Sequence, residues 1–455
     1  MYINVPEKVE RIIGVLKENG YEAYAVGGCV RDSILGREPG DWDITTSASP
    51  YEVKELFHRT IDTGIQHGTV TVMLDKEGFE VTTYRLDGEY EDCRHPKQVE
   101  FTKSLEEDLK RRDFTINAMA YNEEDGMVDL FEGLLDIKRK CIRCVGKAED
   151  RFEEDALRIL RAVRFSAQIN FEIEQDTRLA IEKKAENLVN ISAERIREEL
   201  NKLFLSDYPE KLQIAYETGI TKVVLPELDA RKHESFEYAG KMFNSGDFAL
   251  KVLKEISHVG HTEQDMYEVK EKTPIKRKLA NKERLCLSYA SLLWQPNGAD
   301  KDQEEQAEAA KKVMRRLKFD NDTIQCVTRL VRFAHIQIEE DATSVRKAMN
   351  QMGIELMDLW FLFQRINSTC MVSSKEDARV VHDEKLYELY QEIMDAKECV
   401  NLKDLTINGK DLIQLGCQPG VQIGELLSKL LQHVLEHPQD NQKDVLEQLA
   451  KKQIR

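Results

Sequence analysis

The sequence of 455 residues contains no long hydrophobic run. A membrane-spanning helix needs about 20 consecutive apolar residues, and no segment approaches that length. Residues 1–10 also lack the basic-then-apolar order of a secretory signal peptide. Charged residues make up 33% of the chain. Together these observations predict a cytoplasmic protein that does not enter a membrane.

Paired cysteines at metal-ligand spacing are also lacking. The nine cysteines are scattered, and an odd number in a chain without a signal peptide predicts reduced thiols rather than a disulfide framework. Cys141 and Cys144 form the only close pair, and no second pair follows at zinc-ligand spacing. We expect these two residues to be small buried side chains on a strand, with a zinc or redox role as the alternative.

An excess of positive charge is missing as well. The 83 acidic residues outnumber 66 basic ones, and the net charge is -17. Affinity for a phosphate backbone comes mainly from lysine and arginine, so this total counts against nucleic-acid binding. Nine lysines and arginines nevertheless lie between residues 138 and 164. They predict one positive lane on an otherwise acidic surface.

Hydrophobic periodicity divides the chain into two parts, and no repeat of fixed period is visible. Apolar residues at helical spacing predict a first helix that ends at Gly20. Strand-like runs follow at residues 69–74, 79–84 and 98–102. From about residue 150 the pattern is helical almost without interruption. A chain of this length predicts two to four domains or a helical array.

A pair of glycines after a strand-like run begins the most informative segment. Residues 23–26, Ala-Tyr-Ala-Val, predict a strand, so Gly27 and Gly28 come at its end. Backbone N–H groups of glycines can approach phosphate without a Cβ in the way. Arg31 adds a fixed positive fork. These residues predict a turn that binds a triphosphate.

A pair of aspartates, Asp41 and Asp43, follows this turn. On an extended segment, side chains two residues apart point to one face, so both carboxylates can bind the same divalent ion while Trp42 points to the other layer. Magnesium prefers such hard oxygen ligands. Either motif alone is typical of an ordinary turn or loop. Their combination in this order predicts nucleotidyl transfer.

Three ordered motifs resemble those of one known family. Residues 26–43, the run Arg-Arg-Asp-Phe-Thr-Ile-Asn-Ala at residues 111–118, and Glu-Asp-Ala-Leu-Arg at residues 154–158 resemble the class II tRNA nucleotidyltransferases. This family includes CCA-adding enzymes and bacterial poly(A) polymerases, and the bacterial CCA-adding type is the nearer. The resemblance continues through the first 200 residues or so and returns more weakly at residues 407–412.

The resemblance implies an α+β protein. Its N-terminal nucleotidyltransferase head, polymerase-beta-like with a mixed sheet, is followed by an all-helical neck, body and tail. We expect a catalytic head at residues 1–145, a nucleotide-selecting neck at 146–205, a body at 206–345 and a tRNA-binding tail at 346–455. In the body, residues 285–293 resemble a phosphohydrolase-type (HD-like) domain whose metal-binding His-Asp dipeptide is replaced by Trp294-Gln295. Phosphohydrolase activity is therefore not expected.

The resemblance also implies a reaction. The 3′-hydroxyl of tRNA attacks the α-phosphate of CTP or ATP, and pyrophosphate leaves, with two Mg²⁺ ions held by Asp41 and Asp43. Glu80, on a predicted strand, is the candidate third carboxylate, with a solvent-facing glutamate as the alternative. Arg112 is implied to contact the triphosphate.

Two further sets of residues are implied to shape the nucleotide pocket. Asp113 and Asn117 are implied to order its sugar side where a helix begins at residues 114–119, while a helix cap is the alternative for Asp113. The second set forms a stripe of three-residue steps along one predicted helix: Asp155, Arg158, Arg161 and Arg164. A salt-bridged solvated face is one interpretation.

The family implies another role for this stripe. Asp155 and Arg158 would hydrogen-bond the Watson–Crick edge of cytosine or adenine, and Arg161 and Arg164 would contact triphosphate or RNA. Residues 85–96 predict a mobile loop, and its presence favours full CCA addition over CC addition in this family. Lys410, in the tail, is a candidate phosphate contact.

The predicted activity is therefore template-independent addition of C, C and A to tRNA. An A-adding enzyme or poly(A) polymerase is the nearest alternative, and a silent RNA-binding module or a phosphohydrolase is a more distant one. Metal ligation by His258 and His261, or by His382 and Asp383, is less favoured than an ordinary surface role. No obligatory protein partner is evident.

Overall fold

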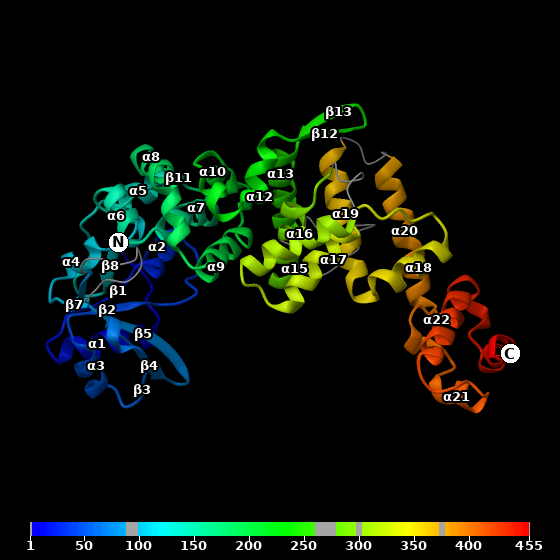
Figure 1. Ribbon diagram of the computed structural model, residues 1–455. Coiled ribbons are helices and arrows are strands. Elements are labelled where there is room, and N and C mark those ends of the chain that lie inside the picture. The colour runs from blue at the N-terminus through cyan, green and yellow to red at the C-terminus, as the bar shows by residue number, and fades with distance from the viewer. Residues whose placement is uncertain (1, 88–98, 260–278, 297–302, 373–377, 455) are drawn as a thin grey trace. The chain divides into compact units, whose positions relative to one another are not determined.

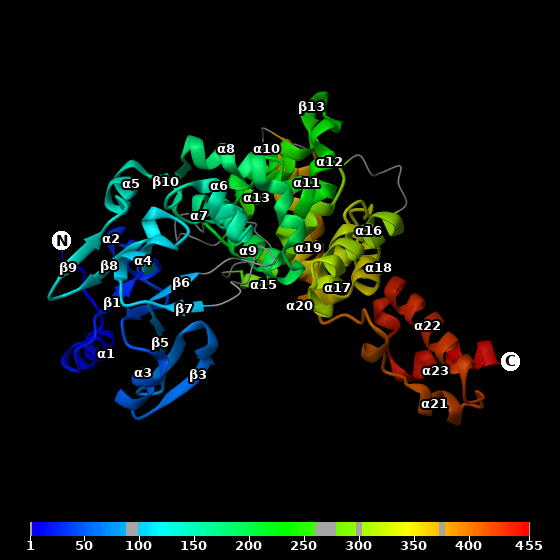
Figure 2. The same cartoon turned by 60° about the vertical axis from the view of Figure 1, so that its left-hand side comes forward.

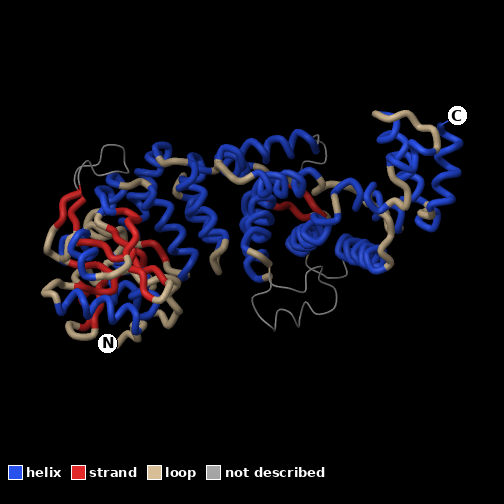
Figure 3. The backbone as a smooth tube through the Cα atoms, turned by 90° about the horizontal axis from the view of Figure 1, so that it is seen from below, coloured by secondary structure: helices blue, strands red, loops and turns tan. Residues whose placement is uncertain are grey.

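The computed structural model describes residues 2–87, 99–259, 279–296, 303–372 and 378–454. The chain divides into two compact units, Met1–Asp229 and Ala230–Arg455. Within the described residues, no helix is both long enough and apolar enough to span a membrane. Figure 3 shows strands gathered in the N-terminal part of the chain and helices in most of the remainder.

The first unit contains a seven-stranded mixed sheet with the order β3-β4-β5-β2-β1-β8-β9 (Figure 1). Its strands are β1 (Ala23–Val26), β2 (Ile44–Thr46), β3 (Thr60–Gly64), β4 (Thr69–Leu74), β5 (Glu77–Thr83), β8 (Met119–Asn122) and β9 (Gly126–Asp129). The β2–β5 pair is parallel, and the other neighbours are antiparallel. The predicted mixed sheet is thus confirmed.

Two smaller strand pairs accompany this sheet. β6 (Arg85–Asp87) pairs antiparallel with β7 (Val99–Phe101). β10 (Cys141–Ile142) pairs parallel with β11 (Glu172–Ile173). Cys144, just after β10, is buried and Cys141 is half-buried.

The helices of the first unit cover the sheet and then continue without it. They are α1 (Glu7–Glu18), α2 (Gly28–Ile34), α3 (Pro50–Leu56), α4 (Leu105–Lys110), α5 (Gly133–Arg139), α6 (Ala148–Glu154), α7 (Leu157–Ile169), α8 (Gln175–Lys184), α9 (Ala193–Phe204), α10 (Leu212–Glu217), α11 (Ile220–Val224) and α12 (Pro226–Ala230). The apolar residues of α1 are buried as its periodicity predicts. α1 and α3 lie side by side (Figures 1 and 2).

The second unit is built from helices around an aromatic core. Its helices are α13 (Ser245–His258), α15 (Asn281–Leu293), α16 (Gln303–Arg316), α17 (Asn321–Arg332), α18 (Ala342–Met352), α19 (Ile354–Met371), α20 (Ala378–Asp395), α21 (Gly409–Gln414), α22 (Val421–Glu436) and α23 (Lys443–Ile454). Trp294, directly after α15, is buried against the rings of Phe248 and Phe363. Its indole nitrogen donates to Nε2 of His335 at 2.9 Å.

The prediction of a wholly helical second part has exceptions. β11 lies beyond the head, and β12 (Ser235–Tyr238) forms an antiparallel hairpin with β13 (Lys241–Asn244). The two turn residues, Ala239 and Gly240, both have positive φ, 48° and 74°, which matches the twist that a two-residue hairpin needs. Local turn geometry therefore produces a hairpin that the helical pattern around it conceals.

Candidate active site

Gly27 makes the turn from β1 into α2. Its φ of 84° and ψ of -126° lie in a region that glycine adopts and other residues avoid. A Cβ added to Gly27 would lie 3.1 Å from Nη1 of Arg112. The missing side chain therefore lets the guanidinium of Arg112 approach the backbone of the turn.

The predicted carboxylate pair lies beside this turn. The N–H of Val26 donates to the carbonyl oxygen of Asp43 at 3.0 Å, which places Asp43 at the end of β1. Asp41 and Asp43 are both exposed on the extended segment before β2. Since two residues separate them, their side chains share a face of that segment. The fold thus brings the turn and the carboxylate pair together, as the sequence predicts.

Glu80 lies on the strand next to the pair. Ile44 of β2 is in register with Val81 of the parallel strand β5, so Glu80 is level with Asp43 and on the same face. Although Asp43 as a whole is exposed, the protein around its carboxyl group partly desolvates that group and raises its pKa to about 6. The charges of Asp41 and Glu80 act in the same direction, while Arg112 opposes them. These four charged groups therefore interact electrostatically.

The donor set fits a magnesium ion. Among the described residues, no three acidic, histidine or cysteine side chains form a ready-made metal cluster, and the prediction of Glu80 as third carboxylate rests on its register beside Asp43. Two carboxylates of exposed residues on one face of an extended segment suit Mg²⁺, which usually keeps several water ligands. Asp41 and Asp43 are the residues that could hold it.

Arg31 is buried, and three of its five N–H donors are engaged. Nε and Nη2 donate to the carboxylate of Asp32, both at 2.9 Å, and Nη1 donates to Asn117 at 2.7 Å. Its guanidinium carbon lies 5.0 Å from the centre of the Phe165 ring. Arg31 therefore fastens α2 to residue 117 and to α7.

Arg112 retains donor capacity beside the turn. Nη2 donates to Asp108 at 3.3 Å, whereas Nε is buried without a hydrogen-bond partner in the described structure. A buried donor without a partner is costly. Arg112 is thus the predicted phosphate contact that the structure leaves most ready for an anion.

The prediction that residues 114–119 begin a helix was wrong. Only one 3₁₀ turn, Thr115–Asn117, forms before β8 starts at Met119. β8 pairs with β1, with Val26 opposite Ala120. Pairing with a distant strand thus overrides the local helical pattern.

Asp113, just before this turn, is buried and bound by three groups. Its oxygens accept from the N–H of Phe114 at 2.8 Å, from Asn117 at 3.1 Å and from Arg161 at 2.7 Å. Burial would raise the pKa of Asp113, but Arg161 and Asn117 outweigh it and hold the pKa below its ordinary value. Asp113 therefore stays charged and joins the head to α7.

The prediction that Asp155 shares a helix with the three arginines was also wrong. α6 ends at Glu154 and α7 begins at Leu157, and Asp155 between them has φ -139° and ψ 102°. Its carboxylate accepts from the N–H of Leu157 at 3.0 Å. A side chain that binds the backbone two residues ahead competes with a continuing helix, so the chain breaks here.

Each arginine of α7 is paired with an acidic residue. Arg158 donates to Glu154 at 2.6 Å and to the carbonyl of Arg111 at 2.9 Å. Arg161 pairs with Asp113, as described above. Arg164 lies 3.2 Å from Glu199, and burial lowers its pKa to about 10. The positive charge predicted for residues 158–164 is therefore neutralised by ion pairs.

Exposed cations remain between residues 138 and 147. Lys138, Arg139, Lys140 and Lys147 are exposed. No ion pair joins any of them to another described residue. This short segment keeps the positive charge expected for an RNA contact.

Three acidic or basic residues that form ion pairs with the predicted site residues were not themselves predicted. Arg195 on α9 pairs with Asp155 at 2.8 Å, and Glu199 on the same helix pairs with Arg164. Asp108 binds both Arg111 and Arg112. Opposite charges four residues apart, as in Arg195 and Glu199, were the available signal.

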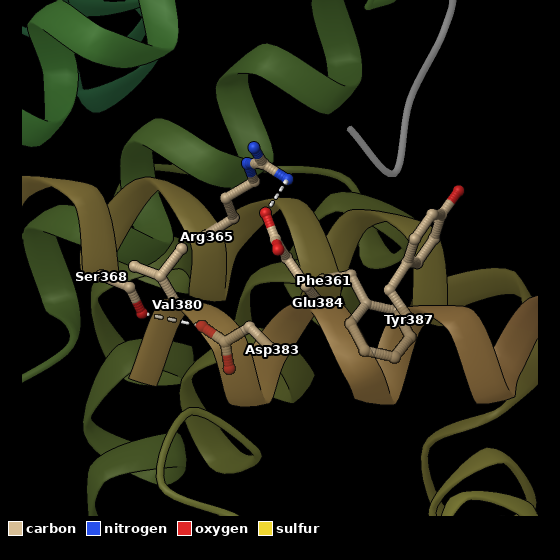
Figure 4. A pocket seen from close by; sticks show the side chains of 7 residues that line it. All are labelled: Phe361, Arg365, Ser368, Val380, Asp383, Glu384 and Tyr387. Carbon is tan, nitrogen blue, oxygen red and sulfur yellow. Dashed lines mark hydrogen bonds and ion pairs between the residues drawn. The ribbon is translucent and has the colours of Figure 1, made fainter. Parts of the chain in front are cut away.

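The histidines and Asp383 that were considered as metal ligands lie outside the nucleotidyltransferase head. Asp383 accepts from Ser368 at 2.8 Å across a small cavity between α19 and α20 (Figure 4), and His382 contacts Glu340 at 3.0 Å. His258 ends α13, and His261 lies outside the described residues.

The loop predicted at residues 85–96 falls largely on residues 88–98, which the structure does not describe. Lys410 is exposed at the start of α21.

The mixed-sheet head, its exposed aspartate pair and its glycine turn define a nucleotidyltransferase head domain followed by helical units. Residues 23–143 match the family model described as "Poly A polymerase head domain". Residues 170–232 match "Probable RNA and SrmB- binding site of polymerase A", and residues 303–450 match "tRNA nucleotidyltransferase domain 2 putative". These three models match separate parts of the chain, and each describes a domain of a poly A polymerase or a tRNA nucleotidyltransferase.

Two curated relatives of this chain are named CCA-adding enzyme. A CCA-adding enzyme of Lactobacillus delbrueckii subsp. bulgaricus is 57% identical over 194 residues, which are 43% of this chain and 49% of that protein. A CCA-adding enzyme of Levilactobacillus brevis is 48% identical over 244 residues, 51% of this chain and 62% of that protein. The chain therefore spans about half to three-fifths of the length of these relatives.

Solved structures resemble the chain over nearly its whole length. The Bacillus stearothermophilus CCA-adding enzyme in complex with CTP is similar with a TM-score of 0.71 and 29% identity, over 98% of this chain and 96% of that one. The Thermotoga maritima CCA-adding enzyme complexed with tRNA has a TM-score of 0.61 and 20% identity, over all of both chains. The second similarity shows the fold alone.

Proposed function

We propose that this chain is a CCA-adding tRNA nucleotidyltransferase, which adds C, C and A to the 3′ end of tRNA from CTP and ATP and releases pyrophosphate. The observation that carries the proposal is the position of Asp41 and Asp43 beside the Gly27 turn and Arg112. The relatives named CCA-adding enzyme and the similarity to a CTP-bound CCA-adding enzyme support it.

The residues of the head divide the work. Asp41 and Asp43 would hold Mg²⁺, which when bound makes the 3′-hydroxyl more acidic and offsets charge on the phosphates. Arg112 and the N–H group of Gly28 bind the triphosphate, while the N–H of Gly27 donates to the carbonyl of Met119 at 3.2 Å and holds the turn in place. Arg31 orients α2 through its bonds to Asp32 and Asn117.

The residues around α7 select the base. Asp155 and Arg158 bind the Watson–Crick edge of cytosine or adenine, after the contacts of Asp155 with Arg195 and of Arg158 with Glu154 adjust. Arg161 and Arg164 support this arrangement through Asp113 and Glu199. The head, neck, body and tail at the predicted boundaries complete the proposal, and the reaction takes place in the cytoplasm.

Contact with tRNA is assigned to two regions. Lys138, Arg139, Lys140 and Lys147 offer exposed positive charge next to the helices of the first unit. Lys410 offers an exposed cation in the tail. Since the whole chain is strongly acidic, these local cations have to supply most of the attraction to RNA phosphates.

Single-nucleotide mapping of products tests the proposal. The purified protein is given tRNA that ends at the discriminator base, with Mg²⁺ and CTP, ATP or both. The expected result is CC and no more with CTP, then one A with both nucleotides. Long A tails would assign the chain to poly(A) polymerases, whose head-domain model it matches, and A addition only to a CC-ended tRNA would assign it to A-adding enzymes.

A further inference from the structure

Asp108 is a fully buried aspartate in α4 whose role the chemistry above does not explain. Its exposed fraction is 0%. The next residue, Leu109, belongs to a core cluster with Tyr24 and Tyr84. A carboxylate in such surroundings is costly unless it is paired and hydrogen-bonded. The hydrogen-bond partners of Asp108 therefore indicate which side chains it positions.

Four donors surround the carboxylate of Asp108. Oδ1 accepts from Nε and Nη2 of Arg111 at 2.9 and 2.7 Å. Oδ2 accepts from Nη2 of Arg112 at 3.3 Å and from Oγ1 of Thr45 at 3.2 Å. Burial would raise the pKa of Asp108, but Arg112 and Arg111 hold it below its ordinary value. The carboxylate of Asp108 is thus charged and accepts hydrogen bonds from three side chains.

Two of these side chains lead directly to the candidate active site. Arg112 extends from Asp108 to the Gly27 turn, where a Cβ on the glycine would be 3.1 Å from Nη1. Thr45 lies on β2, two residues after Asp43. Asp108 consequently connects the arginine over the turn with the strand that follows the carboxylate pair.

We infer that Asp108 is a positioning residue for the triphosphate and for its pyrophosphate product: it fixes the guanidinium of Arg112 over the Gly27 turn, in register with the strand of Asp43. The inference rests on the proposed function. Nη2 of Arg112 bonds to Asp108, while its Nε has no hydrogen-bond partner among the described residues, so without this carboxylate the arginine can leave its position. A misplacement of about 1 Å in a site of this kind costs up to about 100-fold in rate.

The test compares Asp108→Asn with wild type in the full chain. Asparagine keeps the size of the side chain but removes the charge that holds two arginines. We expect the affinity for Mg²⁺-pyrophosphate, measured by calorimetry, to fall by at least about tenfold and the KM for CTP to rise similarly. The KM for tRNA should stay unchanged. Unchanged pyrophosphate affinity overturns the inference.

A double variant separates positioning from a general structural role. If Asp108 acts through Arg112, Asp108→Asn should add less than about twofold to the loss caused by Arg112→Met. Losses that multiply would show independent roles and overturn the inference. Asp125→Asn is a control for loss of a multiply bonded head carboxylate, because Asp125, although exposed, also accepts from Lys17, Tyr24 and Asn122. It should bind pyrophosphate like wild type.

Two further arms keep the inference testable. If Asp108→Asn does not fold, Thr45→Val removes the hydroxyl that lies 3.2 Å from Asp108 and 3.3 Å from the carbonyl of Thr82. It should weaken pyrophosphate binding by about two- to fivefold; no change overturns the inference. Because binding is measured without turnover, wild type that binds pyrophosphate but adds no nucleotide would contradict the proposed function alone. Wild type that does not bind pyrophosphate would contradict both.

Discussion

Nη2 of Arg195 donates to the carboxylate of Asp155 at 2.8 Å. This pair joins the break between α6 and α7 to α9, and Asp155 also accepts from the N–H of Leu157. The orientation of Asp155 is therefore set by its own backbone and by an arginine 40 residues away in the chain. A nucleotide base that binds Asp155 has to share this carboxylate with Arg195 or displace the arginine.

Replacing Asp155 should relax nucleotide choice. Asp155→Ala removes an acceptor for the base edge, and one such contact discriminates by about 1–3 kcal/mol. We expect the preference for CTP and ATP over UTP and GTP, measured as ratios of kcat/KM, to fall by roughly tenfold. Arg195→Met should lower it less, since Leu157 still orients the carboxylate. Unchanged ratios in Asp155→Ala would contradict base selection by this residue.

Replacing Asp41 should abolish nucleotide addition. The variant Asp41→Ala loses half of the exposed carboxylate pair, and we expect incorporation to fall by more than about 100-fold while tRNA affinity is retained. Filter binding with labelled tRNA and gel analysis of products measure the two quantities. Substantial residual incorporation would remove the proposed metal role.

Glu80→Gln decides the role of the third carboxylate. Glu80 is exposed and level with Asp43 on the adjoining strand, but it is not grouped with the aspartates in a three-ligand cluster. We expect incorporation to fall by less than about tenfold, because the glutamate acts through charge rather than as a ligand. A loss as large as that of Asp41→Ala would show direct ligation.

Stability should depend on the charge of Asp113 at acidic pH. Its pKa is held below the ordinary value of about 3.9 by Arg161 and Asn117 despite burial. The unfolded state therefore binds more protons than the folded state below that value, so the contribution is complete above about pH 5 and is lost as the pH falls through the lowered pKa. Asp113→Asn should cost about 3 kcal/mol at pH 7 and less at pH 3, as denaturant titrations can measure. An equal cost at both pH values would contradict this.

The exposed cations before α6 should contribute to tRNA affinity through charge alone. Replacing Lys138, Arg139 and Lys140 by glutamine should weaken tRNA binding and flatten the dependence of log K on log salt by up to about 2 units. Fluorescence anisotropy over a salt series measures both. The matched control replaces three other exposed or half-exposed head lysines, Lys8, Lys54 and Lys76, and should leave the slope unchanged. Equal salt slopes for wild type, the triple variant and the control variant would exclude this surface as a tRNA contact.

Elements with a strong local signal were predicted closely. β1 covers residues 23–26, and β4 covers 69–74, as their apolar patterns indicate. In these cases the local pattern and the tertiary environment agree, because a buried strand or an amphipathic helix needs the same periodicity that the sequence displays. The glycine turn and the aspartate pair were predicted for a similar reason. The turn and the pair lie only a short distance apart in the chain, so their proximity follows from local structure.

The amino-acid sequence by itself determined the glycines, aspartates and arginines on which the proposed phosphate, metal and base contacts depend. Tertiary structure alone decided what those residues contact: it turned residues 119–122 into a strand, broke the helix at Asp155 and paired the arginines of α7 with Asp113 and Glu199. The physical reason is that strand pairing and ion pairing join residues far apart in the chain, and their energies exceed the few tenths of a kcal/mol by which local helix propensity favours one conformation.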